Sequence, residues 1–216
     1  MLFPKISNYH QEWLSVDDDH DIYLEQSGNA NGIPVIYLHG GPGGGCSDNH
    51  RRYFDPSKYR IILFDQRGCG RSKPSPSIEN NTIEQLINDI EKIRQHLGIR
   101  QWIVSGGSWG TTLALAYGIE HAENILGFIL RGIFLGSKTE CDWLYNADGA
   151  AKFYPEYYRD FIGHLPEKAQ KDPLKGYYDL LNSSNEVAVI AASKAWCLWE
   201  LQLSTLENHN IGMAQV

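Results

Sequence analysis

The chain has 216 residues, of which 42% are hydrophobic and 21% charged, the balance of a globular protein with one core and room for an appendage. Its formal net charge of −7, with no basic stretch, argues against a nucleic acid or an anionic membrane as partner. The first thirteen residues lack the apolar run of a signal peptide, and no segment is apolar over a bilayer's thickness. We therefore expect a cytoplasmic protein.

Five segments have the pattern of strands: 21–28, 33–40, 59–66, 101–108 and 125–134. Segments 33–40 and 59–66 are almost continuously apolar, as is typical of strands buried on both faces of a parallel sheet. Segment 82–97 carries apolar residues at helical spacing, with Thr82 as a cap and Gly98 as a stop signal. The small residues of 109–122 predict a second helix. Alternating strands and helices indicate an open α/β sheet with right-handed crossovers.

The pattern changes near residue 137. The region 137–216 has no long apolar strand, and its helical segments are rich in tryptophan, tyrosine and phenylalanine. We therefore predict two parts, an α/β core over 1–136 and a helical region over 137–216.

Nothing in the residue pattern indicates a metal or a cofactor. The sequence holds four scattered cysteines without a C-x-x-C pair: Cys46, Cys69, Cys141 and Cys197. The acidic run from Asp17 to Asp21 lies between two strand-like segments, so we interpret it as a solvated hairpin turn.

The strongest chemical signal is the G-x-S-x-G motif of residues 106–110. It lies where strand 101–108 meets helix 109–122. A nucleophilic serine on such a turn needs glycine at both ends, because larger side chains would clash with the neighbouring strand and helix. Ser108 is therefore the candidate nucleophile, and the N–H of Trp109 would point towards the group it attacks.

A glycine-rich loop, LHGGPGGGCS, occupies residues 38–47. As a phosphate loop it nearly fits G-x-x-x-x-G-K-[ST], but Cys46 stands in the place of the lysine. The loop fits well as a source of oxyanion donors. It follows strand 33–40, which comes two strands before strand 101–108 along the chain, and serine α/β hydrolases place a donor after that strand. We therefore favour an oxyanion that forms during reaction over a bound phosphate.

Four segments together resemble proline iminopeptidases (prolyl aminopeptidases), serine peptidases of the α/β-hydrolase fold: LHGGPGGG, LFDQRGCGRS, GGSWGTTLALAY and LRGIFL. The resemblance extends through AASKAWCLWE to Glu200. It implies a mostly parallel sheet flanked by helices, an α-helical cap, and removal of N-terminal proline from small peptides. Ser108 would attack the proline carbonyl, and the N–H groups of Gly41 and Trp109 would hold the oxyanion. Glu200 would bind the free amino group of the substrate.

The acid and the base of such an enzyme do not stand where the fold requires them. They should follow the serine, each after a later strand, yet the later histidines lie elsewhere: His121, His164 and His209. The family pattern continues past the cap with strands that carry an aspartate and a histidine. We therefore expect a C-terminally truncated member without either residue, with an exposed sheet edge that favours association.

Three alternatives remain open. An esterase or an aminopeptidase of other specificity would share the motif and the loop. A non-catalytic protein that binds peptides or partners is favoured by the missing acid and base, and a nucleotide-binding protein is the minor alternative. Epoxide hydrolase and dehalogenase chemistry is disfavoured, because those enzymes have a carboxylate where this chain has Ser108.

Overall fold

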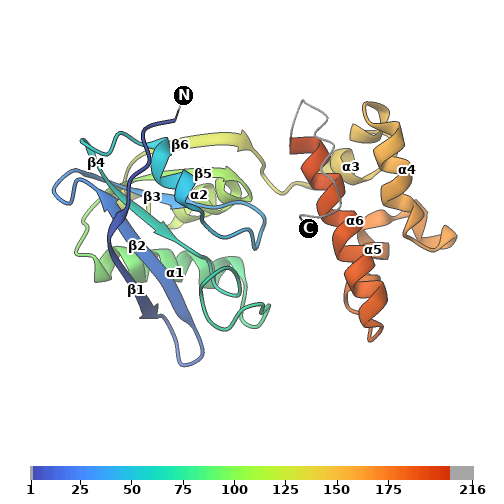
Figure 1. Ribbon diagram of the computed structural model, residues 1–216, viewed down its shortest axis with the longest axis horizontal. Helices are drawn as coiled ribbons and strands as arrows, with labels where there is room; N and C mark the ends of the chain where they lie inside the picture. Colours follow the sequence, from blue (N-terminus) through green and yellow to red (C-terminus); the bar gives the residue numbers. More distant parts are fainter. Residues whose placement is uncertain (1, 205–216) are drawn as a thin grey trace. The chain divides into compact units, whose positions relative to one another are not determined.

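A computed structural model of the protein describes residues 2–204 (Figure 1). They form two compact units, the first ending at Gly136 and the second beginning at Ser137. The change in residue pattern near 137 and this division coincide.

The first unit is built on a six-stranded sheet with the order β1-β2-β4-β3-β5-β6. Its strands are β1 (Asn8–Ser15), β2 (Asp21–Gly28), β3 (Ile33–Leu38), β4 (Tyr59–Phe64), β5 (Trp102–Ser108) and β6 (Ile125–Ile133). The pairs β1–β2 and β2–β4 are antiparallel, whereas β4, β3, β5 and β6 run parallel. The mostly parallel sheet is therefore confirmed, and the carboxyl ends of β4, β3 and β5 lie next to one another.

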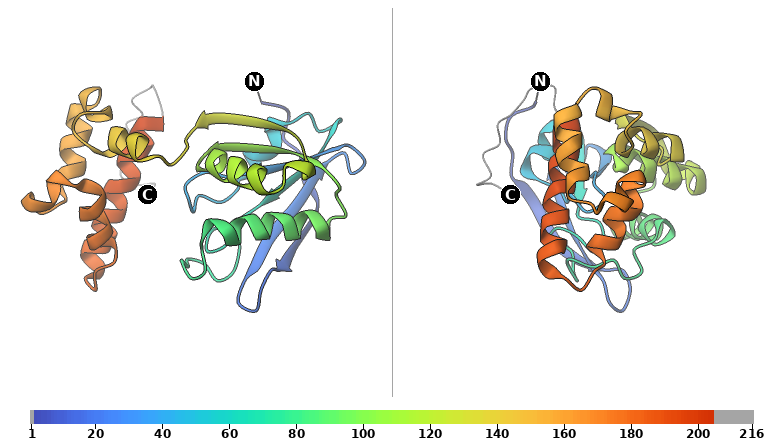
Figure 2. Two further views of the ribbon diagram at one scale, coloured as in Figure 1. Left: turned by 180° about the vertical axis from the view of Figure 1, so that it is seen from behind. Right: turned by 90° about the vertical axis from the view of Figure 1, so that its right-hand side faces the viewer.

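Two helices cover one face of this sheet, α1 (Ile83–His96) and α2 (Trp109–Glu120), which lie side by side in Figure 2. Helix α1 buries its apolar stripe there, and the Thr82 hydroxyl caps it by accepting a hydrogen bond from the Gln85 N–H. The buried side chains between helices and strands include Ile36, Val104 and Leu113, which are fully shielded from solvent. This core fixes the positions of the strand ends that carry the site.

The opposite face is covered by the short helix η1 (Asp48–Tyr53) and Phe54, which pack near β3 and β4. Strand β6 forms one edge of the sheet. Four of its apolar side chains are 42–64% exposed: Leu126, Phe128, Ile129 and Ile133. Among the described residues, no strand pairs with the outer side of β6.

The second unit contains four α-helices in its described part: α3 (Lys138–Tyr145), α4 (Pro155–Gly163), α5 (Pro173–Leu181) and α6 (Glu186–Ser204). Aromatic side chains form its core. Phe161 stacks on Tyr177 with ring centroids 4.6 Å apart and lies 5.4 Å from Trp199. The Tyr177 hydroxyl donates to the Phe161 carbonyl at 2.7 Å, so this buried polar group is satisfied. No helix in residues 2–204 is long and apolar enough to cross a bilayer.

Candidate active site

Ser108 lies at the turn that joins β5 to α2, as the motif predicts. Its backbone has φ 54° and ψ −124°, a conformation that a residue with a side chain rarely adopts, and its side chain is exposed. A Cβ on Gly106 would lie 2.3 Å from the Gly110 carbonyl oxygen, and a Cβ on Gly110 would lie 2.1 Å from the Leu38 carbonyl oxygen. Both motif glycines are therefore required by close backbone contacts.

The glycine-rich loop after β3 lies directly against this turn. A Cβ on Gly40 would be 3.4 Å from the Ser108 Cβ and 3.1 Å from the Gly107 carbonyl oxygen. The loop then turns at Gly41, whose φ is +125°, and the Gly44 N–H donates to the Gly40 carbonyl at 3.2 Å. The structure thus brings Gly40, Gly41, Ser108 and Trp109 together at the carboxyl edge of the sheet.

His39 is structural. Its ring is 1% exposed, Nδ1–H donates to the Gly40 carbonyl at 2.9 Å, and Nε2 accepts the Gln66 backbone N–H at 3.0 Å. Burial lowers the pKa of His39, which keeps the ring neutral as these two bonds require. With both ring nitrogens occupied, His39 has no free nitrogen to accept the Ser108 proton.

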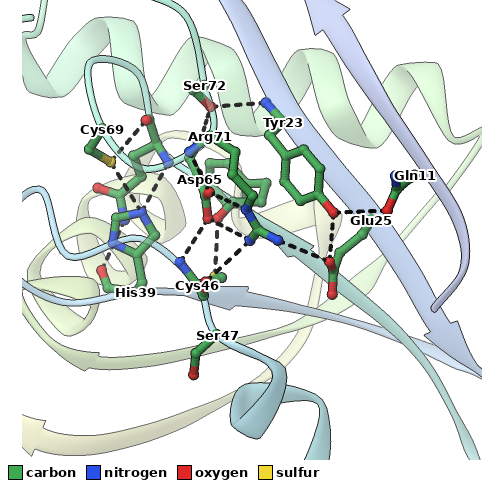
Figure 3. A network of polar contacts seen from close by, with 12 residues as sticks. Gln11, Tyr23, Glu25, His39, Cys46, Ser47, Asp65, Cys69, Arg71 and Ser72 are labelled. Carbon is green, nitrogen blue, oxygen red and sulfur yellow. Dashed lines mark hydrogen bonds and ion pairs between the residues drawn. The ribbon is translucent and has the colours of Figure 1, made fainter. Parts of the chain in front are cut away.

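A buried carboxylate holds the far end of the loop (Figure 3). Asp65, 1% exposed, accepts the Cys46 N–H at 2.7 Å and the Arg71 Nε–H at 2.7 Å. Burial alone would raise the pKa of Asp65, but the hydrogen bonds from Arg71 and from the two backbone N–H groups outweigh it and lower the pKa. Because this carboxylate already accepts a loop N–H, a phosphate at Gly40–Ser47 would meet a negative charge, which argues against a nucleotide site.

A second buried carboxylate extends this network. Glu25, 1% exposed, accepts two hydrogen bonds from Arg51 at 2.6 and 2.9 Å and pairs with Arg71 at 3.4 Å. Sequence reasoning did not identify Glu25 or Arg51, which lie far apart in the chain. The nearest signal was the D-x-R-G pattern that begins at Asp65.

The two cysteines near the site carry protonated thiols. Burial raises the pKa of Cys69 to about 11, and it raises that of Cys46 well above its usual value. A thiol in this state is a poor nucleophile, which leaves the exposed Ser108 hydroxyl as the candidate nucleophile of the turn.

Glu200 lies in the second unit, on α6, where it is half-buried. The Tyr145 hydroxyl donates to Glu200 Oε1 at 2.7 Å, and the Tyr145 ring stacks on Trp196 with centroids 4.6 Å apart. Burial and the Glu200 carboxylate raise the pKa of Tyr145, so the phenol remains a donor. Trp196 and Glu200 are one turn apart on the helix, which places an aromatic ring beside a carboxylate.

The histidines that follow Ser108 do not meet it within residues 2–204. His121 ends α2, next to Tyr117, and His164 ends α4 in the second unit. His209 lies outside the described residues. In the same part of the chain, no group of three or more His, Cys, Asp or Glu side chains is arranged to hold a metal ion.

The model of the alpha/beta hydrolase fold matches residues 33–206, which include strands β3 to β6, the turn at Ser108 and the glycine-rich loop. The chain belongs to this family. Solved structures agree on the fold of this α/β hydrolase: the proline iminopeptidase of Mycobacterium smegmatis superimposes with a TM-score of 0.57 at 18% identity, over 90% of this chain and 69% of that chain. An epoxide hydrolase from metagenomes of hot environments gives a TM-score of 0.58 at 17% identity, over 88% and 60% of the two chains.

Curated sequences that this α/β hydrolase resembles are proline iminopeptidases. It is 47% identical to that of Xylella fastidiosa over 95% of this chain and 65% of the relative. It is 48% identical to that of Arabidopsis thaliana over 95% of this chain and 54% of the relative. The chain therefore spans less than two thirds of the length of these relatives.

Proposed function

We propose that this chain carries the nucleophile and oxyanion hole of a serine peptidase that releases N-terminal proline from small peptides. The observation that carries the proposal is the strained, exposed Ser108, packed against the Gly40–Gly41 turn at the carboxyl edge of the sheet. The similarity to proline iminopeptidases supports the peptide substrate.

Ser108 Oγ attacks the carbonyl carbon of the proline, and the carbonyl oxygen takes up a negative charge. The N–H groups of Gly41 and Trp109 then donate to that oxygen. Donors of this kind act in the transition state, where each contributes about 3–4 kcal/mol. Trp109 is the first residue of α2, so its N–H also lies at the positive end of the helix dipole.

The similarity to proline iminopeptidases supports a role for Glu200 in binding the ammonium group of the substrate's first residue. A half-buried carboxylate pairs with a cation more strongly than with a neutral amide, which selects a chain end over an internal peptide bond. The ring of Trp196, one helical turn away, offers an apolar surface for the pyrrolidine ring.

The Ser108 proton needs a base, and a serine without one is a weak nucleophile. Because no histidine in residues 2–204 hydrogen-bonds to Ser108, we propose that the catalytic histidine and aspartate are not among these residues.

The test is hydrolysis of a prolyl chromogenic anilide by the wild-type chain, by Ser108→Ala and by Ser105→Ala. Ser105 is a matched control, since it is a serine of the same strand, 5% exposed. Turnover by the wild-type chain that vanishes in Ser108→Ala and persists in Ser105→Ala supports Ser108 as the nucleophile, and it means that the chain holds a base for this serine outside residues 2–204. A folded wild-type chain without turnover contradicts the peptidase as an activity of this chain.

Glu200→Gln tests the substrate end of the site. Losing a charge-assisted hydrogen bond costs about 1.5–3 kcal/mol, so kcat/KM for the anilide should fall by about tenfold to a hundredfold. An N-acetylated substrate, which lacks the ammonium group, should be hydrolysed equally poorly by both chains. Equal kcat/KM of the two chains for the free prolyl anilide refutes the assignment.

A second candidate is a protein that binds peptides without cleaving them, favoured by the lack of a histidine beside Ser108 in the described residues. Labelling of Ser108 by a fluorophosphonate argues against it, because the reagent reports an activated serine. Faster cleavage of a short acyl ester than of the prolyl anilide would indicate an esterase.

A further inference from the structure

Gln66 links three segments of the site. It lies two residues past the end of β4 and is 2% exposed. Its side-chain Nε2–H donates to the His39 carbonyl at 2.9 Å, and its Oε1 accepts the Trp109 indole N–H at 3.1 Å. Because β3 lies between β4 and β5, the side chain reaches across the end of β3 to the helix that follows Ser108.

The two hydrogen bonds use the two polar atoms of the Gln66 amide group, one as a donor and the other as an acceptor. A backbone carbonyl only accepts, and an indole N–H only donates, so the amide orientation of Gln66 is set by its partners. The backbone N–H of Gln66 adds a third bond, to His39 Nε2 at 3.0 Å. An ionised glutamate at position 66 would lack the donor. A methionine, whose side chain has nearly the same length, would lack both the donor and the acceptor.

The partners of Gln66 belong to the two segments that carry the proposed oxyanion donors. His39 leads directly into Gly40 and Gly41, and Trp109 itself carries the second donor. A Cβ on Gly110 would also lie 3.1 Å from the His39 carbonyl oxygen, so this carbonyl lies close to the turn that carries Ser108 and Trp109. A side chain that bonds both sides at this point controls the spacing between them.

We propose that Gln66 is a positioning residue that holds the glycine-rich loop and Trp109 at the separation the oxyanion hole requires. This rests on the proposed function. Gln66 does not touch the reacting atoms in this mechanism; it acts through His39 and Trp109. Its loss therefore lowers kcat, because the donors are needed in the transition state, and leaves substrate binding at Glu200 unchanged.

The experiment compares wild-type, Gln66→Met and Gln66→Glu in the prolyl anilide assay across the pH range in which the wild type is active. Tyr117→Phe is the matched control, since it removes a hydrogen bond of a fully buried side chain, to Glu91 at 3.0 Å, far along α2 from Trp109. Amide and indole N–H resonances of Gly41 and Trp109 are recorded for each variant.

We expect Gln66→Met to lower kcat by about tenfold to a hundredfold with KM changed by less than about twofold. In Gln66→Glu, burial favours the neutral acid, whose O–H donates to the His39 carbonyl while its C=O accepts from Trp109. The kcat of Gln66→Glu relative to wild type should therefore rise as pH falls, whereas that of Gln66→Met stays flat. Tyr117→Phe should leave kcat and the resonances unchanged.

The proposal is overturned if the kcat of Gln66→Met equals that of the wild type. It is also overturned if the kcat of Gln66→Glu relative to wild type does not depend on pH. Either result leaves the proposed peptidase activity standing. If the wild type itself does not hydrolyse the anilide, the proposed function fails, and the positioning role is judged on the resonances alone. Gly41 and Trp109 signals unmoved by Gln66→Met then overturn it.

Discussion

The loop that carries Asp65 and Gln66 is anchored by one buried ion pair, between Arg67 and Asp89. Both side chains are almost fully shielded, with 1% and 0% exposed. Arg67 donates through Nε and Nη2 to the two Asp89 oxygens at 2.7 and 2.6 Å, a bidentate arrangement. Replacing Asp89 by Asn keeps the volume, removes the charge and replaces one of the two acceptors of Arg67 by an N–H donor.

Removing one partner of a buried pair costs about 3–5 kcal/mol, because it leaves the other charge uncompensated. Arg67 keeps two further contacts at 3.1 Å, to Asp17 Oδ2 and to the Asn80 carbonyl. Asp17 is 33% exposed and therefore compensates only in part. We expect Asp89→Asn to lower the free energy of unfolding by about 3 kcal/mol, the lower end of that range.

The assay is urea unfolding combined with hydrogen exchange of the β3 and β5 amides, which reports opening of the first unit by itself. Lys58→Met is the control, because Lys58 pairs with Asp55 at 3.6 Å with its side chain 71% exposed, and such a pair contributes less than about 1 kcal/mol. The double variant Arg67→Met/Asp89→Leu should recover much of the loss. A cost of Asp89→Asn below about 1 kcal/mol would refute the reasoning.

Three other predictions concern backbone contacts, histidines and the sheet edge. Gly110→Ala should lower the free energy of unfolding by at least about 3 kcal/mol, because its Cβ would lie 2.1 Å from a backbone oxygen. Gly127→Ala, whose Cβ would have nothing within 4 Å, should be nearly neutral in the same unfolding assay. Burial lowers the pKa of His39, and burial together with the nearby charges lowers that of His50 to about 4. The folded state therefore disfavours protonation of these two histidines, and the free energy of unfolding should fall as pH drops from 6.5 towards about 4. A free energy of unfolding that stays constant over this pH range contradicts the prediction. The exposed edge strand β6 should promote association, and Ile129→Lys should reduce the sedimentation coefficient measured at high concentration; an unchanged monomeric value for wild type counts against it.

Local patterns were enough to predict most elements and the position of Ser108. Apolar runs and helical spacing are properties of neighbouring residues, so they indicated β3, β4, β5, α1 and α2 close to the observed bounds. The glycines at 106 and 110 pointed to a tight turn because larger side chains there would clash with the neighbouring strand and helix, and the structure shows such close contacts at both positions. The order of the strands in the sheet, with β3 between β4 and β5, did not follow from these signals.

The supporting groups of the site depend on contacts between residues far apart in the chain. Glu25 meets Arg51, and Gln66 meets both His39 and Trp109, only because the sheet places their strand ends side by side. No spacing in the sequence encodes those pairings, since hydrogen bonds and ion pairs act over a few ångströms in space and not along the chain. The position of the proposed nucleophile, Ser108, is thus set by the local sequence, whereas the contacts that hold the glycine-rich loop arise only in the folded sheet.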